Sequence, residues 1–198
     1  MTEKLTYIQK KGAEIESVFD DLASLRIAVF REFPYLYDGS IEYEKEYLKT
    51  YTQSERSFLF AVYDGEKMIG ATTCIPLKDE TAEISEPFTE TGFDVHAVFY
   101  FGESILLPEY RGKGLGNRFF DEREAHAQSF KEYKMCCFCS VERDENHPLK
   151  PADYRSNEVF WKKRGYVNVP GIHAAMEWPD IGETVSSAKK MTFWIKHI

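Results

Sequence analysis

The stretch LLPEYRGKGLGNRFF, residues 106–120, decides how the rest of the chain is interpreted. The apolar run HAVFYFGESILLP, residues 96–108, leads into it and has the composition of a strand. The amphipathic run at residues 117–133 follows it and has helical spacing. The sequence therefore predicts a strand, a glycine-rich turn and a helix in direct succession.

The turn itself combines alternating glycines with positive charge. Its glycines can adopt positive φ and allow the backbone to approach a ligand closely. The free N–H groups and the dipole at the start of the following helix favour an anion. The residues concerned are Arg111, Gly112, Lys113, Gly114 and Gly116. This pattern predicts a phosphate or pyrophosphate site, with a tight turn closed by a capping glycine as the alternative.

Other phosphate-binding motifs do not fit the same residues. The turn lacks the GxxxxGK[ST] pattern of P-loop nucleotidases. Its glycines are spaced GxGxG rather than GxGxxG, and the chain does not open with the βαβ unit of a dinucleotide-binding fold. Both of these nucleotide-binding classes are therefore excluded at this site.

Further from the turn, the pattern alternates between strands and helices over the whole chain. Before the turn we expect a strand at LTYIQK, helices at 15–31 and 41–53, a hairpin of 57–64 with 67–76 around Asp64-Gly65, and a loop with at most a short helix at 78–95. After it we expect a strand at 135–141, a helix at 153–165, and strands at 172–178 and 191–198. This order predicts one mixed α/β (α+β) domain over residues 1–198.

Two motifs together resemble the GNAT superfamily of acyl-CoA N-acyltransferases. The turn is similar to the family signature [RQ]-x-x-G-x-[GA], with Arg111, Gly114 and Gly116 at the defining positions. FWKKRGY, residues 160–166, resembles the family's late helix ending, an aromatic residue followed four positions later by a glycine-aromatic pair. The resemblance implies a central, mostly antiparallel sheet of about seven strands, splayed at the acyl-CoA site, with helices on both faces.

The resemblance also implies a reaction and a binding site. The expected enzyme is an N-acetyltransferase that moves the acetyl group of acetyl-CoA, its cosubstrate, to a primary amine by direct attack. The alternative is a GNAT-fold protein that binds acyl-CoA without turnover. The implied CoA-binding residues are Ser104, Ile105 and Leu106 for the pantetheine arm, and Arg111, Gly112, Lys113, Gly114, Leu115, Gly116 and Asn117 for the pyrophosphate.

Glu103 is the candidate base. An amine arrives protonated at neutral pH, so some group must accept a proton, and a carboxylate often does so. Glu103 is a lone carboxylate in the apolar run FYFGESILL, where it needs a partner or a cleft. We therefore predict a base or substrate anchor, with a purely structural partner as the alternative.

The proton donor for the departing thiolate is harder to assign. Many relatives carry a tyrosine where this chain has Trp161, and an indole N–H cannot act as the acid. Tyr154 is the chosen candidate, with a packing role as its alternative. Ser156, Tyr166 and solvent are the other options.

The amino-acid composition and the net charge limit the kinds of binding partner that the chain can have. A net charge of −8 argues against nucleic acid as the main partner and is compatible with a cationic acceptor. No apolar run is long enough for a membrane span, and the N-terminal stretch lacks a signal-peptide core, so we expect a cytoplasmic protein. Neither the cysteines nor the histidines have metal-binding spacing, so no metal is expected. The expected partners are a small-molecule or peptide amine and, as one option, a second copy in a homodimer.

The acidic segment 80–96 is long for a connection between two strands. Long loops in compact domains are often functional. Together with the loop before Met191, this segment is predicted to line the acceptor side, with an ordinary solvated acidic loop as the alternative.

Overall fold

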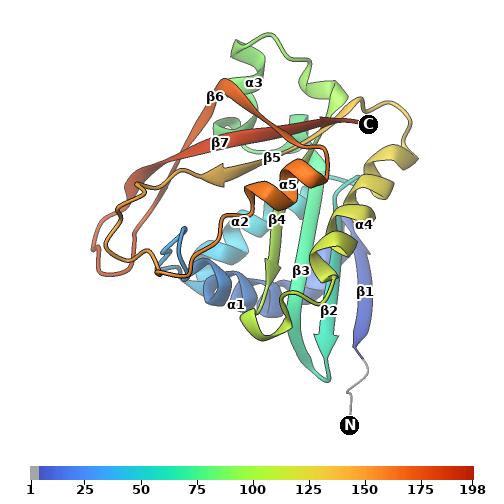
Figure 1. The fold of residues 1–198 in the computed structure, drawn as a ribbon. Coiled ribbons are helices and arrows are strands. Elements are labelled where there is room, and N and C mark those ends of the chain that lie inside the picture. Colours follow the sequence, from blue (N-terminus) through green and yellow to red (C-terminus); the bar gives the residue numbers. More distant parts are fainter. Residues whose placement is uncertain (1–4) are drawn as a thin grey trace.

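The computed structural model describes residues 5–198, which form a seven-stranded sheet in the order β1-β2-β3-β4-β5-β7-β6 (Figure 1). Neighbouring strands are antiparallel except β4 and β5, which are parallel. The strands are β1 (Thr6–Lys11), β2 (Phe58–Asp64), β3 (Lys67–Pro76), β4 (Val98–Leu106), β5 (Met135–Val141), β6 (Val167–Trp178) and β7 (Ser187–His197). The prediction of a mostly antiparallel sheet of about seven strands is confirmed.

Five α-helices accompany the sheet within residues 5–198. They are α1 (Phe19–Phe30), α2 (Ile41–Gln53), α3 (Ala82–Glu90), α4 (Leu115–Ser129) and α5 (Glu158–Lys163). Helix α1 packs on β3 and β4 and also contacts α2, whereas α4 packs on β2, β3 and β4 from the other face (Figure 1). The expected arrangement of helices on both faces is therefore present.

The hairpin and the second helix lie where the sequence places them. Asp64 pairs with Lys67 across a two-residue turn, and Gly65 adopts φ +60°, a conformation that glycine accepts readily. Helix α2 has the predicted bounds, and the Ser40 hydroxyl caps it by accepting from the Tyr43 N–H at 3.3 Å.

The first helix begins later than predicted. Residues Gly12–Val18 form a 3-10 helix before α1 starts. Gly12, Ile15 and Val18 are all buried, and their three-residue spacing places them on one edge of a 3-10 helix. The apolar residues at 15 and 18 therefore follow a period of three rather than the α-helical period.

The segment 78–95 contains the short helix that the sequence allowed, which is α3. Ile84 and Phe88 are buried at helical spacing on α3, and the Phe88 ring packs edge-on against Phe193 at 4.8 Å. Pro87 and Gly92 suggest a break. Pro87 removes only one helical hydrogen bond near the end of α3, so packing on β7 prevails.

Helix α5 is shorter than the predicted 153–165. The Ser156 hydroxyl accepts from the Glu158 N–H at 3.2 Å and fixes the first turn, so the preceding residues remain irregular. Gly165, at φ +87°, follows the end of the helix.

Strands β4 and β5 separate along their length. Only Val98–Tyr100 of β4 pairs with β5, whereas β4 stays paired with β3 as far as Leu106. Figure 1 shows β5 turning away across the molecule while β4 continues toward the glycine turn. From residue 101 onward, the β5-facing edge of β4 therefore lacks a strand partner among residues 5–198.

Candidate active site

The glycine turn presents a row of free backbone donors. Gly112 and Gly114 have φ of +76° and +88°, and Gly114 is the N-cap of α4 without a side-chain cap. Within residues 5–198, the backbone N–H groups of residues 112–116 have no protein hydrogen-bond partner. A Cβ added at Gly112 or Gly114 would meet no atom within 4 Å. The turn is therefore an open cradle of N–H groups suited to an anion.

The charged side chains of the turn have different surroundings. Arg111 donates to the Leu106 carbonyl at 3.0 Å and pairs with Glu32 at 2.8 Å, so it braces the turn against the end of β4 and the segment after α1. Lys113 is exposed, with its ammonium 5.0 Å from the Tyr110 ring centroid. The Asn117 N–H already donates to the Gly114 carbonyl at 3.1 Å, so only its side chain is available to an anion.

The three residues expected along the pantetheine lie on the unpaired edge of β4. Ser104 is exposed, Ile105 is buried and Leu106 is partly buried. Their pairing with β3 is intact, opposite Thr72, Ala71 and Gly70. Any binding by Ile105 or Leu106 on the open side would therefore use backbone groups, while their side chains pack.

A β-bulge turns Glu103 toward α1 and α2. Between the pairs Thr72–Ser104 and Cys74–Phe101, β4 has one residue more than β3. The Glu103 carbonyl accepts from the Thr72 hydroxyl at 2.8 Å and from buried Arg123 of α4 at 3.3 Å, which fixes the bulge. Its carboxylate consequently lies on the face of the sheet opposite α4.

The carboxylate of Glu103 is buried and only half satisfied. Arg26 of α1 forms ion pairs with Oε2 of Glu103 and with Oε2 of Glu44 on α2. Oε1 of Glu103 has no hydrogen-bond partner in the described chain. Burial raises the pKa of Glu103, and Arg26 opposes that rise. A buried carboxylate with a free oxygen and a raised pKa is suited to accept a proton.

Glu103 and Glu44 face a cavity of about 80 Å³ with mainly aromatic walls. Seven of its fourteen lining residues are aromatic, and two more are methionines. The aromatic residues come from α1, the segment after it, α2, β4 and β6, and they are Phe30, Tyr35, Tyr37, Tyr43, Tyr47, Tyr100 and Trp178. The cavity thus lies between the two halves of the sheet and the α1–α2 pair.

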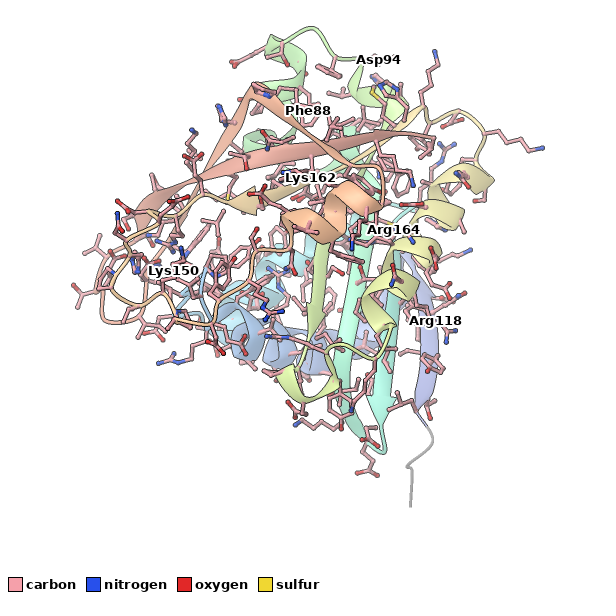
Figure 2. All side chains as sticks on the ribbon, in the orientation of Figure 1. Phe88, Asp94, Arg118, Lys150, Lys162 and Arg164 are labelled. Atoms are coloured by element: carbon pink, nitrogen blue, oxygen red, sulfur yellow. The ribbon has the colours of Figure 1, made fainter. Side chains whose placement is uncertain are left out.

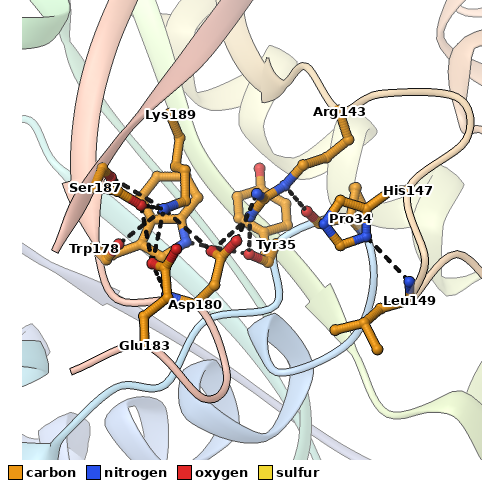
Figure 3. A network of polar contacts seen from close by, with 10 residues as sticks. All are labelled: Pro34, Tyr35, Arg143, His147, Leu149, Trp178, Asp180, Glu183, Ser187 and Lys189. Atoms are coloured by element: carbon orange, nitrogen blue, oxygen red, sulfur yellow. Dashed lines mark hydrogen bonds and ion pairs between the residues drawn. The ribbon is translucent and has the colours of Figure 1, made fainter. Parts of the chain in front are cut away.

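A clamp of ion pairs holds one wall of this cavity (Figure 3). Arg143 forms two contacts with Asp180, at 2.7 and 2.8 Å, and also donates to the carbonyls of Pro34 and Tyr35. Lys189 lies 3.3 Å from the same aspartate. Burial favours neutral Asp180, but Arg143 and Lys189 lower its pKa overall. The segment carrying Tyr35 is thereby fixed to the β6–β7 hairpin.

The segment 80–96 does not line the cavity, contrary to prediction. Figure 2 shows Phe88 and Asp94 at the end of the molecule around α3. Glu80 approaches from behind the wall, where the Tyr47 hydroxyl donates to it at 3.2 Å, and Glu83 lies close enough to Tyr43 to contribute, after burial and Glu44, to the raised pKa of that tyrosine. Burial raises the pKa of Glu80 to about 8. The other half of that prediction named the loop before Met191, and no residue of that loop lines this cavity, although Pro179 and Ser186 line a second hollow that shares Trp178 with it.

The candidate proton donors lie apart from Glu103. Tyr154 packs edge-on against Phe33 at 4.7 Å and is not a lining residue. The Tyr166 hydroxyl is buried and donates to Glu124 at 3.1 Å. Trp161 packs against Phe138 and Trp194. The structure therefore brings neither Tyr154 nor Tyr166 together with the base.

Arg26 and Glu44 are site residues that the sequence reasoning missed. Glu44 is fully buried on the same face of α2 as Leu48 and Tyr51, at spacings of four and seven residues. A charged residue within an apolar helical stripe is a signal that could have identified it.

Residues 5–198 contain neither a metal-binding cluster nor a membrane-spanning helix. No group of three His, Cys, Asp or Glu side chains is placed to hold a metal ion. No helix of that part of the chain is long and apolar enough to cross a membrane.

Comparison of structures shows the same fold in several solved acetyltransferases. A GNAT-family acetyltransferase from Streptococcus pneumoniae is 12% identical, with a TM-score of 0.57 over 98% of this chain and 99% of that chain. Ribosomal-protein-alanine N-acetyltransferase from Brucella melitensis is 9% identical, with a TM-score of 0.59 over 96% of this chain and 99% of that chain. At such identities the likeness shows the fold alone.

Sequence comparison gives the family. A search of curated proteins found no matching sequence. The model of the acetyltransferase (GNAT) family matches residues 22–151, which include the glycine turn, the bulge, Glu44 and Glu103. The chain therefore belongs to the GNAT family of acetyltransferases.

Proposed function

We propose that this chain is an acetyl-CoA-dependent N-acetyltransferase that acts on a primary amine by direct transfer. The observation that carries the proposal is that the expected binding features follow one another along β4. The free N–H groups of residues 112–116 come shortly after the unpaired edge of that strand, and Glu103 on the same strand lines a cavity. Because one sheet runs through the whole described chain, we also propose a single domain.

Acetyl-CoA would bind along this path. The pyrophosphate would accept hydrogen bonds from the N–H groups of residues 112–116, helped by the charge of Lys113 and the side-chain amide of Asn117. Arg111 would act by holding the turn on β4, through its bond to Leu106. The pantetheine amides would pair with the edge at Ser104–Leu106, as an added strand does.

The reaction needs a base and stabilisation of an oxyanion. Glu103 Oε1 accepts a proton from the incoming ammonium, and the neutral amine then attacks the thioester carbonyl carbon. A backbone N–H on the open edge of β4 stabilises the oxyanion that forms. Collapse breaks the C–S bond and releases the CoA thiolate, and the second amine proton passes to water, which leaves the neutral amide.

Tyr154 is the proposed donor of a proton to the thiolate. Its supporting observation is the contact of its ring with Phe33 at 4.7 Å, two residues before Tyr35, which lines the cavity. Replacing Tyr154 by Phe tests this role, because solvent would supply the proton if the hydroxyl were dispensable. An unchanged kcat for Tyr154→Phe would assign the proton to solvent.

Free thiol release from acetyl-CoA, measured over a panel of primary amines, tests the function. The proposal expects release that depends on both enzyme and amine. The second candidate is an acyl-CoA-binding protein without turnover, favoured by Trp161 and by the position of Tyr154. Tight acetyl-CoA binding without thiol release for any amine would support that candidate.

A further inference from the structure

Two buried carboxylates line the cavity, and each has one oxygen atom without a hydrogen-bond partner among residues 5–198. Glu44 is 0% and Glu103 is 3% exposed, and both line the cavity. In each, Oε2 is paired with Arg26, whereas Oε1 has no hydrogen-bond partner in residues 5–198. An unsatisfied buried acceptor is costly, so a ligand that donates to both oxygens would gain strongly by binding here.

The charge of this cavity selects against acids. Two carboxylates share a single guanidinium, so the lining carries an excess negative charge when both are ionised. Glu80, behind Tyr47, has a pKa of about 8 and is largely neutral at pH 7. Arg26 is already engaged on both sides and also lies over the Phe30 and Tyr47 rings. A ligand carboxylate would therefore find no free cation in the lining, whereas an ammonium group would be attracted.

The shape of the site has an inner and an outer part. The inner cavity, at about 80 Å³, is well below the roughly 150 Å³ of a protein cavity that binds benzene. A second hollow of about 220 Å³ adjoins it and shares Tyr37, Tyr43 and Trp178 as walls. The inner part suits an ammonium on a narrow unbranched stem, and the aromatic walls of the outer part suit a flat ring.

We propose that the acceptor is an arylalkyl primary amine without a carboxylate, and that Glu44 is the anchor that holds its ammonium beside Glu103. This inference rests on the proposed function only in taking the cavity as the acceptor site. Glu44 Oε1 and Glu103 Oε1 each accept one N–H of the ammonium. The stem passes Tyr37 and Tyr43, and the ring lies in the outer hollow against Trp178.

Calorimetric binding to the wild-type protein tests the class of ligand without requiring turnover. The three probes are 2-phenylethylamine, phenylalanine, which adds a carboxylate, and 2-phenylethanol, which lacks the charge. The proposal expects the amine to bind at least about tenfold more tightly than either of the others. Equal binding of phenylalanine or of the alcohol, or no binding of the amine, would overturn it.

The variant Glu44→Gln tests the anchor. It keeps an oxygen for Arg26 but loses the charge, and we expect roughly tenfold weaker binding of 2-phenylethylamine with unchanged acetyl-CoA affinity. Glu42→Gln is the matched control, an exposed glutamate on the same helix with the same change in charge. Unchanged amine affinity in Glu44→Gln, or an equal loss in Glu42→Gln, would remove Glu44 as the anchor.

The two proposals fail in different ways. If the amine binds as expected but no thiol is released from acetyl-CoA, the ligand class stands and the catalytic function falls. If thiol is released with other amines while 2-phenylethylamine does not bind, the function stands and this inference falls. Melting temperatures of both variants separate a loss of binding from a loss of fold.

Discussion

Glu103 is a buried carboxylate that we propose as the base. The bulge turns its carboxylate toward Arg26, and its carbonyl is held from the other side by Arg123. Glu44, Tyr47 and Glu80 also face this region, and burial is the main cause of the raised pKa of Glu103. The sequence shows the lone carboxylate in an apolar strand, but the bulge that directs it depends on pairing with β3.

Replacing Glu103 by Gln should lower kcat/KM for the amine by roughly 10²-fold, because the shape is kept and the base is lost. In the wild type, the base form disappears as pH falls through the raised pKa of Glu103, so kcat/KM should decline there. The variant should lack this decline, and its defect should shrink at high pH, where more amine is already deprotonated.

The pH profile of kcat/KM, measured beside the melting temperature, distinguishes this role from a structural one. A structural Glu103 would give a loss that does not depend on pH, together with a lower melting temperature. A near-wild-type rate at pH 7 with an intact fold would exclude Glu103 as the base.

Among the elements, the turn between β4 and α4 was the most predictable. Its glycines predict positive φ and free N–H groups, and both are observed at Gly112 and Gly114. Helix α3 was the least predictable, because Pro87 and Gly92 signal a break, whereas the packing of Phe88 on Phe193 favours a helix. The turn could be predicted because its conformation depends on the residues within it, whereas the short helix α3 depends on packing against residues distant in the sequence.

The variant Gly114→Asp should abolish acetyl-CoA binding, because a carboxylate would enter the cradle for the pyrophosphate. Gly92→Asp is a matched control: Gly92 also has positive φ, at +82°, with nothing within 4 Å of an added Cβ. It adds the same charge and similar backbone strain in the segment after α3. Titration calorimetry with acetyl-CoA compares them, and equal affinities in the two variants would contradict the assignment of the turn.

The ion pair between Arg143 and Asp180 should affect the KM for the acceptor but not the KM for acetyl-CoA. Asp180→Asn weakens the hold on Pro34 and Tyr35, so the cavity wall should loosen, raising the acceptor KM severalfold and leaving the acetyl-CoA KM unchanged. Glu142→Gln is the control. Glu142 is next to Arg143 in the sequence and forms an ion pair with Lys190 at 2.9 Å, but both side chains are half exposed, so losing this pair should have little effect. Steady-state kinetics, with each substrate varied in turn, give the two KM values. Equal changes in the KM for the acceptor and the KM for acetyl-CoA would contradict a role of Asp180 in the cavity wall alone.

At the scale of the whole molecule, the candidate site is formed where strands β4 and β5 separate. Three residue pairs join β4 to β5, and beyond them the two strands separate. The gap between the strands leads from the glycine turn, the proposed cofactor site, toward the aromatic cavity. The family resemblance predicted the splay. The wall of the proposed acceptor cavity was not predictable, because Tyr35, Glu44 and Trp178 come from distant parts of the chain that only the tertiary fold brings together.

The central claim is that this chain transfers the acetyl group of acetyl-CoA to an amine. Acetyl-CoA labelled in its acetyl group, incubated with the protein and 2-phenylethylamine or another accepted amine, tests it most directly. The account predicts that label appears in the amide product in equal amount to the CoA released, and that Gly114→Asp abolishes both. Release of CoA with the label in free acetate, or no release while acetyl-CoA stays bound, would contradict it.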